Sequence, residues 1–262
     1  MAARRGRKIF LYALGTLLVL LVGGFIGGRV MRHGHKPAEE VRPGVFRVRN
    51  FFTEIYGVRV GKKVVVFDAG VDPDGGALEA LAAALGTNHD GVTDVFLTHG
   101  HFDHIAAAPL CRNARIHLGI QDADMAAKKR PMIPWGANWF EKLLPVPAVN
   151  LTDAILDRAE VPLDDGRSLE TIPLPGHTAG SYMFLFEGVL FAGDSIQIED
   201  GKLTFANPSF SVDVAQSKRG LAALKTTLAG KPIAQICTGH QGCTVPADTQ
   251  RMLDDLIERA KR

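Results

Sequence analysis

The feature that most constrains this chain is a cluster of potential metal ligands directly after a strand-like run at residues 94–97. Residues 99–104 read His-Gly-His-Phe-Asp-His, which places four ligand-type side chains within six positions. Imidazole nitrogens and carboxylate oxygens suit zinc or a similar divalent metal, and α/β sheets place their sites after such strands. His99 and His101 face the same side of an extended segment, whereas the adjacent Asp103 and His104 suit a chain turning into a helix. Four ligands this close do not fit one tetrahedral ion, so the spacing predicts two metals; the alternative is a His-rich surface turn.

The chain is long enough for one large α/β domain with a hydrophobic core, since it has 262 residues of which 46% are hydrophobic. Its basic residues are unevenly distributed. Residues 1–36 contain no acid and seven of the 30 basic residues: Arg4, Arg5, Arg7, Lys8, Arg29, Arg32 and Lys36. The remainder therefore holds 23 basic and 28 acidic residues, a net charge of −5. A mildly acidic domain argues against a nucleic-acid partner.

The N-terminus contains a candidate membrane span. Twenty uncharged residues, 9–28, lie between Lys8 and Arg29, and as a helix they extend about 30 Å, the thickness of a bilayer core. The basic residues before the span favour a cytoplasmic N-terminus and an extracytoplasmic domain. The run is longer than a usual signal-peptide core and lacks a clear Ala-x-Ala site, which favours an uncleaved anchor over a cleaved, secreted form. We predict a basic tip and anchor at 1–30, a linker at 31–43, and a catalytic domain at 44–262.

The three cysteines, Cys111, Cys237 and Cys243, include no Cys-x-x-Cys pair and predict no disulfide framework. Cys237 ends a strand-like run and is expected to be a small buried hydrophobic residue. A bridge from Cys237 to Cys243 around His240 is the alternative.

One pattern recurs along the domain: an apolar strand followed by a ligand-type side chain at its C-terminal end. It occurs at five positions: Asp68, His99, His177, Asp194 and His240. His117 lacks such a partner and is predicted to be structural. Residues 128–150 contain four prolines and both tryptophans, which indicates an insertion with one short helix. This insertion is either an aromatic lid over the site or an ordinary packed loop.

These motifs resemble those of the metallo-β-lactamase-fold metallohydrolases over residues 44–262. The matching strings are His99-x-His101-x-Asp103-His104, Gly-His177, Gly-Asp194, Gly-His240, and Asp68 within Phe-Asp-Ala-Gly. The resemblance implies an α/β fold, a four-layer αββα sandwich with two mixed sheets face to face and metals at one edge.

The resemblance also implies a ligand set for two divalent ions, with zinc expected and iron or manganese as alternatives. The first ion would be held by His99, His101 and His177, the second by Asp103, His104 and His240, and Asp194 would bridge them. A metal-bridged hydroxide would attack a carbonyl, and the metals would stabilise the oxyanion. Asp103 would be catalytic, orienting the nucleophile or passing a proton. Asp68 would hold a ligand loop or a histidine N–H, unless it only caps a turn.

The bridging residue distinguishes branches of the family. Hydrolases of thioesters, lactones and phosphodiesters carry Asp at the position of Asp194, whereas β-lactamases usually carry Cys or Ser. The chain is similar to the glyoxalase-II-like and lactonase-like branch, without the extra C-terminal helical domain, since 22 residues follow His240. We predict a dinuclear hydrolase of a small ester, thioester or lactone. The alternatives are an iron-dependent persulfide-dioxygenase-like oxidoreductase and a β-lactamase. Four aromatic residues are candidates to line an apolar pocket, or else belong to the core: Trp135, Trp139, Phe205 and Phe210.

Overall fold

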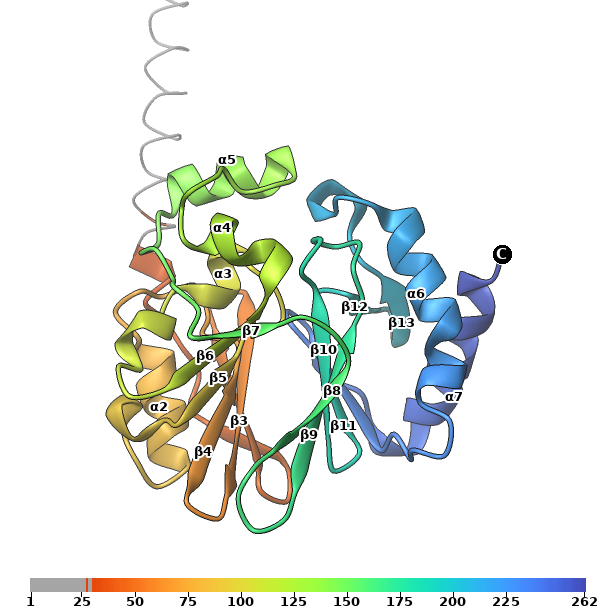
Figure 1. Cartoon of the computed structure of the whole chain (residues 1–262), viewed down its shortest axis with the longest axis horizontal. Helices are drawn as coiled ribbons and strands as arrows, with labels where there is room; N and C mark the ends of the chain where they lie inside the picture. Colours follow the sequence, from red (N-terminus) through yellow and green to blue (C-terminus); the bar gives the residue numbers. More distant parts are fainter. Residues whose placement is uncertain (1–26, 28–29) are drawn as a thin grey trace, which may run out of the picture.

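The computed structural model describes residue 27 and residues 30–262 (Figure 1). The predicted membrane anchor therefore lies outside the described residues. No helix within the described part of the chain is both long and apolar enough to cross a membrane. Residues 39–42 of the predicted linker form a strand, because they pair antiparallel with residues 45–47 at the edge of the first sheet.

The first sheet has seven strands in sequence order, antiparallel from β1 to β4 and parallel from β4 to β7. Their bounds are β1 (Glu39–Arg42), β2 (Val45–Asn50), β3 (Thr53–Val60), β4 (Lys63–Phe67), β5 (Asp94–Phe96), β6 (Arg115–Gly119) and β7 (Asp153–Ile155).

The second sheet has six strands in the order β15-β14-β11-β10-β9-β8, and only its β11–β14 pair is parallel. Its strands are β8 (Ala159–Pro162), β9 (Ser168–Pro173), β10 (Tyr182–Phe186), β11 (Val189–Gly193), β14 (Gln235–Thr238) and β15 (Gly242–Cys243). A separate hairpin joins β12 (Ile196–Glu199) to β13 (Lys202–Phe205).

Helices cover the outer faces of both sheets. Helix α2 (Gly76–Ala84) packs on β2 and β3, while α6 (Val214–Thr227) and α7 (Pro246–Ala260) pack together outside the second sheet (Figure 1). Three short helices lie near the ends of the parallel strands: α3 (Phe102–Ile105), α4 (Ala123–Ala126) and α5 (Trp135–Leu143). Within residues 30–262 the chain also forms four single 3-10 turns: η1 (His89–Gly91), η2 (Ala108–Leu110), η3 (Ile120–Asp122) and η4 (Pro208–Phe210). The predicted αββα layers are confirmed.

Strand β4 shows how the sequence builds these layers. It reads Lys-Val-Val-Val-Phe, a run of β-branched residues that favours an extended strand. Successive side chains alternate between faces, so Val64 and Val66 join the core under α2 while Val65 and Phe67 join the core between the sheets. The Phe67 ring stacks on Phe191 of the opposite sheet, with centroids 3.8 Å apart. The chain leaves β4 at Asp68, at the edge of the sheet where the ligand motifs gather.

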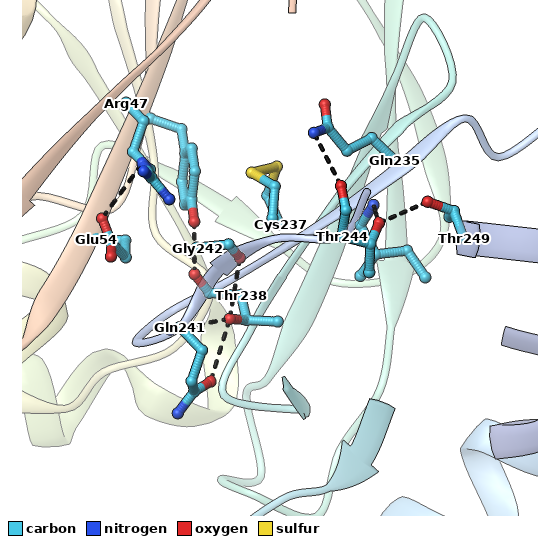
Figure 2. The surroundings of a disulfide bond; sticks show 12 residues. Arg47, Glu54, Gln235, Cys237, Thr238, Gln241, Gly242, Thr244 and Thr249 are labelled. Carbon is cyan, nitrogen blue, oxygen red and sulfur yellow. Dashed lines mark hydrogen bonds and ion pairs between the residues drawn. A yellow bond between two sulfur atoms is a disulfide. The ribbon is translucent and has the colours of Figure 1, made fainter. Parts of the chain in front are cut away.

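The expectation that Cys237 is an unpaired hydrophobic residue is wrong, because Cys237 and Cys243 form a disulfide (Figure 2). The two-residue strand β15 turns back along β14 and places Cys243 directly opposite Cys237. A strand this short has no hydrophobic alternation, so the sequence did not reveal the hairpin. The bridge closes the loop that carries His240. Cys111 is free and buried, and burial raises the pKa of its thiol to about 12.

Candidate metal centre

Three buried imidazoles form the first group of candidate ligands. His99 and His101 follow β5, and His177 lies in the loop after β9. His177 Nε2 lies 3.1 Å from His99 Nε2 and 3.0 Å from His101 Nδ1. Burial, together with the neighbouring imidazoles, lowers the pKa of His99 and of His177 well below the usual value. Three imidazole nitrogens that converge on one point are suited to a zinc-type ion with a further position open to substrate.

Asp103, His104 and His240 form the second group, and their ligand atoms lie within 4.8 Å of one another. Asp103 and His104 occupy the single turn of α3, while His240 follows β14 in the second sheet. Asp103 Oδ2 lies 3.8 Å from His104 Nε2 and 3.7 Å from His240 Nε2. The group thus joins residues from both sheets.

Asp194 lies between the two groups. Its Oδ2 is 2.9 Å from His240 Nε2 and 3.5 Å from His177 Nε2, and its Oδ1 is 3.3 Å from His104 Nε2. Burial raises the pKa of Asp194, but the imidazoles of His240 and His104 outweigh it and lower this pKa well below the usual value. The structure thus brings together all seven residues predicted as ligands.

Two buried atoms test whether this set fits a pair of cations. Among the described residues, His104 Nε2 and Asp194 Oδ1 are buried and make no hydrogen bond. Buried polar atoms normally have a hydrogen-bond partner. These two atoms face each other across 3.3 Å without a hydrogen bond, which points to a missing partner between them. An imidazole nitrogen and a carboxylate oxygen are both ligand types that bind a divalent cation. The residues present therefore fit two divalent ions.

The outward-facing nitrogen of every histidine in the set is also occupied. These contacts are His99 Nδ1 with Thr98 Oγ1 (3.1 Å), His101 Nε2 with the Ile133 carbonyl (2.7 Å), His104 Nδ1 with Asp68 Oδ2 (2.8 Å), His177 Nδ1 with Ser211 Oγ (3.1 Å) and His240 Nδ1 with the Phe52 carbonyl (2.9 Å). Such partners fix ring orientation and aim the other nitrogen inward. Only Asp68 among these partners was singled out from the sequence.

Asp68 holds both a histidine and a ligand loop. Its carboxylate accepts hydrogen bonds from His104 Nδ1, from the Thr98 backbone N–H at 2.7 Å and from the Thr98 hydroxyl. Its backbone is in the left-handed region, with φ of 59°, which is uncommon for a residue other than glycine. These contacts favour a positioning role for Asp68 over a plain turn cap.

Asp122 was not found from the sequence, although it connects the two loops of the first group. Its Oδ2 accepts from the Gly100 N–H at 2.9 Å and the Thr178 hydroxyl at 2.6 Å, and its Oδ1 accepts from the Gly180 N–H at 2.9 Å. A Cβ on Gly180 would lie 2.7 Å from the Asp122 carboxylate carbon, which explains the glycine. The sequence signal that could have identified it is the recurring pattern of a strand followed by a ligand-type side chain, since Asp122 follows the end of β6.

His117 is structural, as predicted. Its Nε2 lies 3.0 Å from Asp94 Oδ1, and its ring stacks on Phe96 with centroids 4.1 Å apart.

A cavity of about 420 Å³ opens beside the ligand set. It is lined by Phe52, His101, Phe102, Asp103, Ala137, Phe140, Asp194, Gln197, Glu199, Asn207, Phe210, His240 and Gln241. None of these lining residues, all within the described part of the chain, is Lys or Arg. The cavity therefore combines aromatic walls with amides and one further carboxylate.

The aromatic candidates divide between wall, core and surface. Phe210 lines the cavity, as expected of a pocket residue, but Phe205 does not, because Lys218 and Arg259 cover its ring. Trp135 and Trp139 belong to neither pocket nor core, since both are exposed on α5. Helix α5 nevertheless supplies Ala137 and Phe140 to the cavity, so the insertion forms one of its walls.

A family model described as the metallo-beta-lactamase superfamily matches residues 48–240. A hydroxyacylglutathione hydrolase from Cereibacter sphaeroides is 32% identical over 164 residues, which cover 62% of this chain and 53% of that protein. The chain thus spans about half the length of this curated relative.

Solved structures share the fold at low identity. A metallo-beta-lactamase family protein from Thermus thermophilus aligns with a TM-score of 0.63 and 19% identity, over 85% of this chain and 81% of that one. A subclass B3 metallo-beta-lactamase of Bradyrhizobium japonicum aligns with a TM-score of 0.63 and 16% identity, over 88% and 94%.

Proposed function

This chain belongs to the metallo-beta-lactamase superfamily, and from that premise we propose that it is a dinuclear metal-dependent hydrolase of small esters, thioesters or lactones. One observation carries the proposal: Asp194 lies between two complete groups of three ligands, beside a cavity. The first ion would be held by His99, His101 and His177, the second by Asp103, His104 and His240, and Asp194 would serve both.

When bound, two such ions would activate water at neutral pH and polarise the substrate carbonyl. The chain's own groups set the geometry around that chemistry. Asp103 lines the cavity, so its carboxylate can orient the attacking water or carry a proton to the leaving group. The aromatic walls, including Phe140 and Phe210, exclude bulk water and bind an apolar acyl group.

The charge of the cavity limits the leaving group. The only charged side chain among its lining residues outside the ligand set belongs to Glu199, since no Lys or Arg lines the described cavity. An anionic leaving group would therefore meet the Glu199 carboxylate with no lysine or arginine side chain to bind it. We propose neutral acyl substrates in preference to anionic ones such as glutathione thioesters or phosphodiesters.

Metal analysis of the purified full chain, combined with a hydrolysis panel, tests this function. The panel compares neutral esters, lactones and neutral thioesters with glutathione thioesters, phosphodiesters and β-lactams. We expect two metal equivalents and turnover of neutral acyl substrates. A protein that holds one iron and consumes oxygen with a persulfide would instead be a dioxygenase, and turnover of β-lactams alone would make it a β-lactamase.

We also propose that residues 9–28 anchor the protein in a membrane and that residues 44–262 lie outside the cytoplasm. The uncharged stretch and the basic residues before it support this arrangement. The Cys237–Cys243 disulfide supports it independently, since disulfides persist in oxidising compartments. Protease should be added to cells whose outer layers have been opened but whose cytoplasmic membrane is intact. It should digest the domain and leave the N-terminal tip protected. Resistance of the whole domain would contradict this placement.

A further inference from the structure

Helix α5 presents two tryptophans to solvent. Trp135 is 76% exposed and Trp139 is 48% exposed, although tryptophan is usually well buried. The two residues are four positions apart, so they share one face of the helix. Trp139 meets the neighbouring Phe140 edge-on, with centroids 5.7 Å apart, and Phe140 contacts Phe210 at the cavity. An apolar surface is thus continuous with the wall of the candidate active site.

Basic residues precede this aromatic helix and lie in its last turn. Residues 128–142 contain four of them, Lys128, Lys129, Arg130 and Lys142, against one acid, Glu141. Lys128 pairs with Glu141, and Lys129 lies 3.8 Å from Asp124. The rest of the domain is mildly acidic, so the positive charge is local to this segment. Exposed tryptophan flanked by Lys and Arg is the composition of protein segments that lie in the interface of a lipid bilayer.

The chain enters the domain at the same place. Val30 and Met31 are exposed, and Arg32 Nη1 donates to the carbonyl of Pro145, just after α5, at 3.0 Å. In Figure 1 the first described residues and α5 lie at the same end of the molecule. The uncharged stretch 9–28 ends two positions before Val30. A bilayer that holds this stretch therefore lies next to α5.

We propose that α5 docks on the bilayer surface, with Trp135 and Trp139 in the lipid interface. The docked helix directs the Phe140 wall of the cavity toward the membrane. The substrate class that follows is a neutral acyl ester or lactone that partitions into the lipid and enters the cavity from it. This substrate assignment rests on the proposed hydrolase function, whereas the docking rests only on the proposed membrane anchor.

The chain contains only these two tryptophans, so its intrinsic tryptophan fluorescence reports on α5 alone. The test places the full chain in nanodiscs of phosphatidylcholine and phosphatidylglycerol built on a tryptophan-free scaffold protein, with acyl chains either plain or brominated at a shallow position. Docking predicts that bromination lowers tryptophan emission by about twofold or more, since the ring of an interfacial tryptophan contacts the upper acyl chain. The matched control carries Trp135→Phe, Trp139→Phe and Val245→Trp, which moves the fluorophore to an exposed site before α7 on the other sheet. Its emission should be the same in both discs.

Equal emission of the unmodified chain in plain and brominated discs would overturn the docking. Protection from acrylamide without quenching by brominated lipid would also overturn it, and would indicate a protein partner instead. Activity separates the two proposals. Quenching in a protein that hydrolyses nothing would leave the docking standing and refute the hydrolase. The double variant Trp135→Ser, Trp139→Ser should hydrolyse membrane-embedded esters more slowly than the wild type does, and soluble esters at the same rate. Wild-type rates on both substrates would refute delivery from the membrane.

Discussion

The carboxylate of Asp68 accepts a hydrogen bond from His104 Nδ1 at 2.8 Å, and both groups are buried. This contact keeps the proton on Nδ1 and leaves Nε2 directed at Asp194, 3.3 Å away. The same carboxylate accepts a hydrogen bond from the Thr98 N–H, and the Thr98 hydroxyl contacts His99 Nδ1. Asp68 therefore positions one ligand of each group, His99 through Thr98 and His104 directly.

Asp68→Ala is therefore expected to weaken metal binding by about 10–100-fold, the usual effect of removing such a partner. The loss should be larger for the second ion, since His104 is the residue released. Zinc affinity measured by competition with a chromophoric chelator tests this, with Asp254→Ala, on the exposed face of α7, as the control. Wild-type affinity in the Asp68 variant would show that the contact is incidental.

Asp103→Asn is expected to reduce kcat/KM by about 10²–10⁴-fold, because the amide cannot accept or carry a proton in the reaction. Circular dichroism and thermal unfolding of the metal-free protein should remain near those of the wild type, since Asp103 lines the cavity and not the core. Asp254→Asn, on the exposed face of α7, is the control for loss of one carboxylate. Full turnover by the Asp103 variant would remove this residue from the catalytic machinery.

Asp122→Ala is expected to lower the free energy of unfolding by about 3 kcal/mol, because it leaves the buried N–H groups of Gly100 and Gly180 without acceptors. The loops that carry His99 and His177 would also separate, so zinc affinity of the first group should fall. Asp124→Ala, an exposed neighbour, should change stability by less than about 0.5 kcal/mol. Denaturant unfolding of both variants compares the two effects, and equal stabilities would contradict the role given to Asp122.

The strand-end pattern predicted much of the site, because parallel strands deliver their C-terminal ends to one sheet edge. Asp68, His99 and Asp194 were placed this way. The groups that hydrogen-bond the outward-facing nitrogens of the histidine ligands were harder to predict. His101 and His240 are held by the backbone carbonyls of Ile133 and Phe52, and a carbonyl has no residue identity that a sequence can reveal.

The cavity wall and the disulfide depended on tertiary structure in the same way. Phe205 and Phe210 are aromatic residues five positions apart in the sequence, at the end of β13 and in η4. Lys218 and Arg259 cover the ring of Phe205, whereas Phe210 lines the cavity. Likewise, the two-residue strand β15 forms because β14 is there to pair with it.

Asp94 should contribute to acid stability away from the metal centre. Burial opposes its ionisation, but hydrogen bonds from His117 and Thr93, with Lys63 and Arg115 nearby, outweigh it and lower the pKa from 3.8 to about 2. A carboxyl whose pKa is lowered on folding stabilises the protein above its unfolded pKa. The contribution is lost as the pH falls toward the folded pKa.

Asp94→Asn is accordingly expected to cost about 2 kcal/mol at pH 7, and the difference from wild type should shrink between about pH 4 and pH 2. Urea unfolding of both proteins after chelation, across this range, measures the difference without a contribution from bound metal. A difference that stays constant down to pH 2 would show that the ionisation of Asp94 is not linked to folding.

The Cys237–Cys243 bridge closes the short loop that presents His240, so removing it should act on one half of the metal centre. Replacing both cysteines by serine is expected to lower the free energy of unfolding by about 2 kcal/mol through the greater freedom of the unfolded chain. His240 would be less firmly held, whereas His99, His101 and His177 lie outside the loop. Zinc retained against a chelator should therefore fall from two equivalents to one. Treating the wild type with a reductant should reproduce this result, and Cys111→Ala, which leaves the bridge intact, should retain both ions. Two tightly held ions in the serine variant would show that the β14–β15 hairpin positions His240 without the covalent bond.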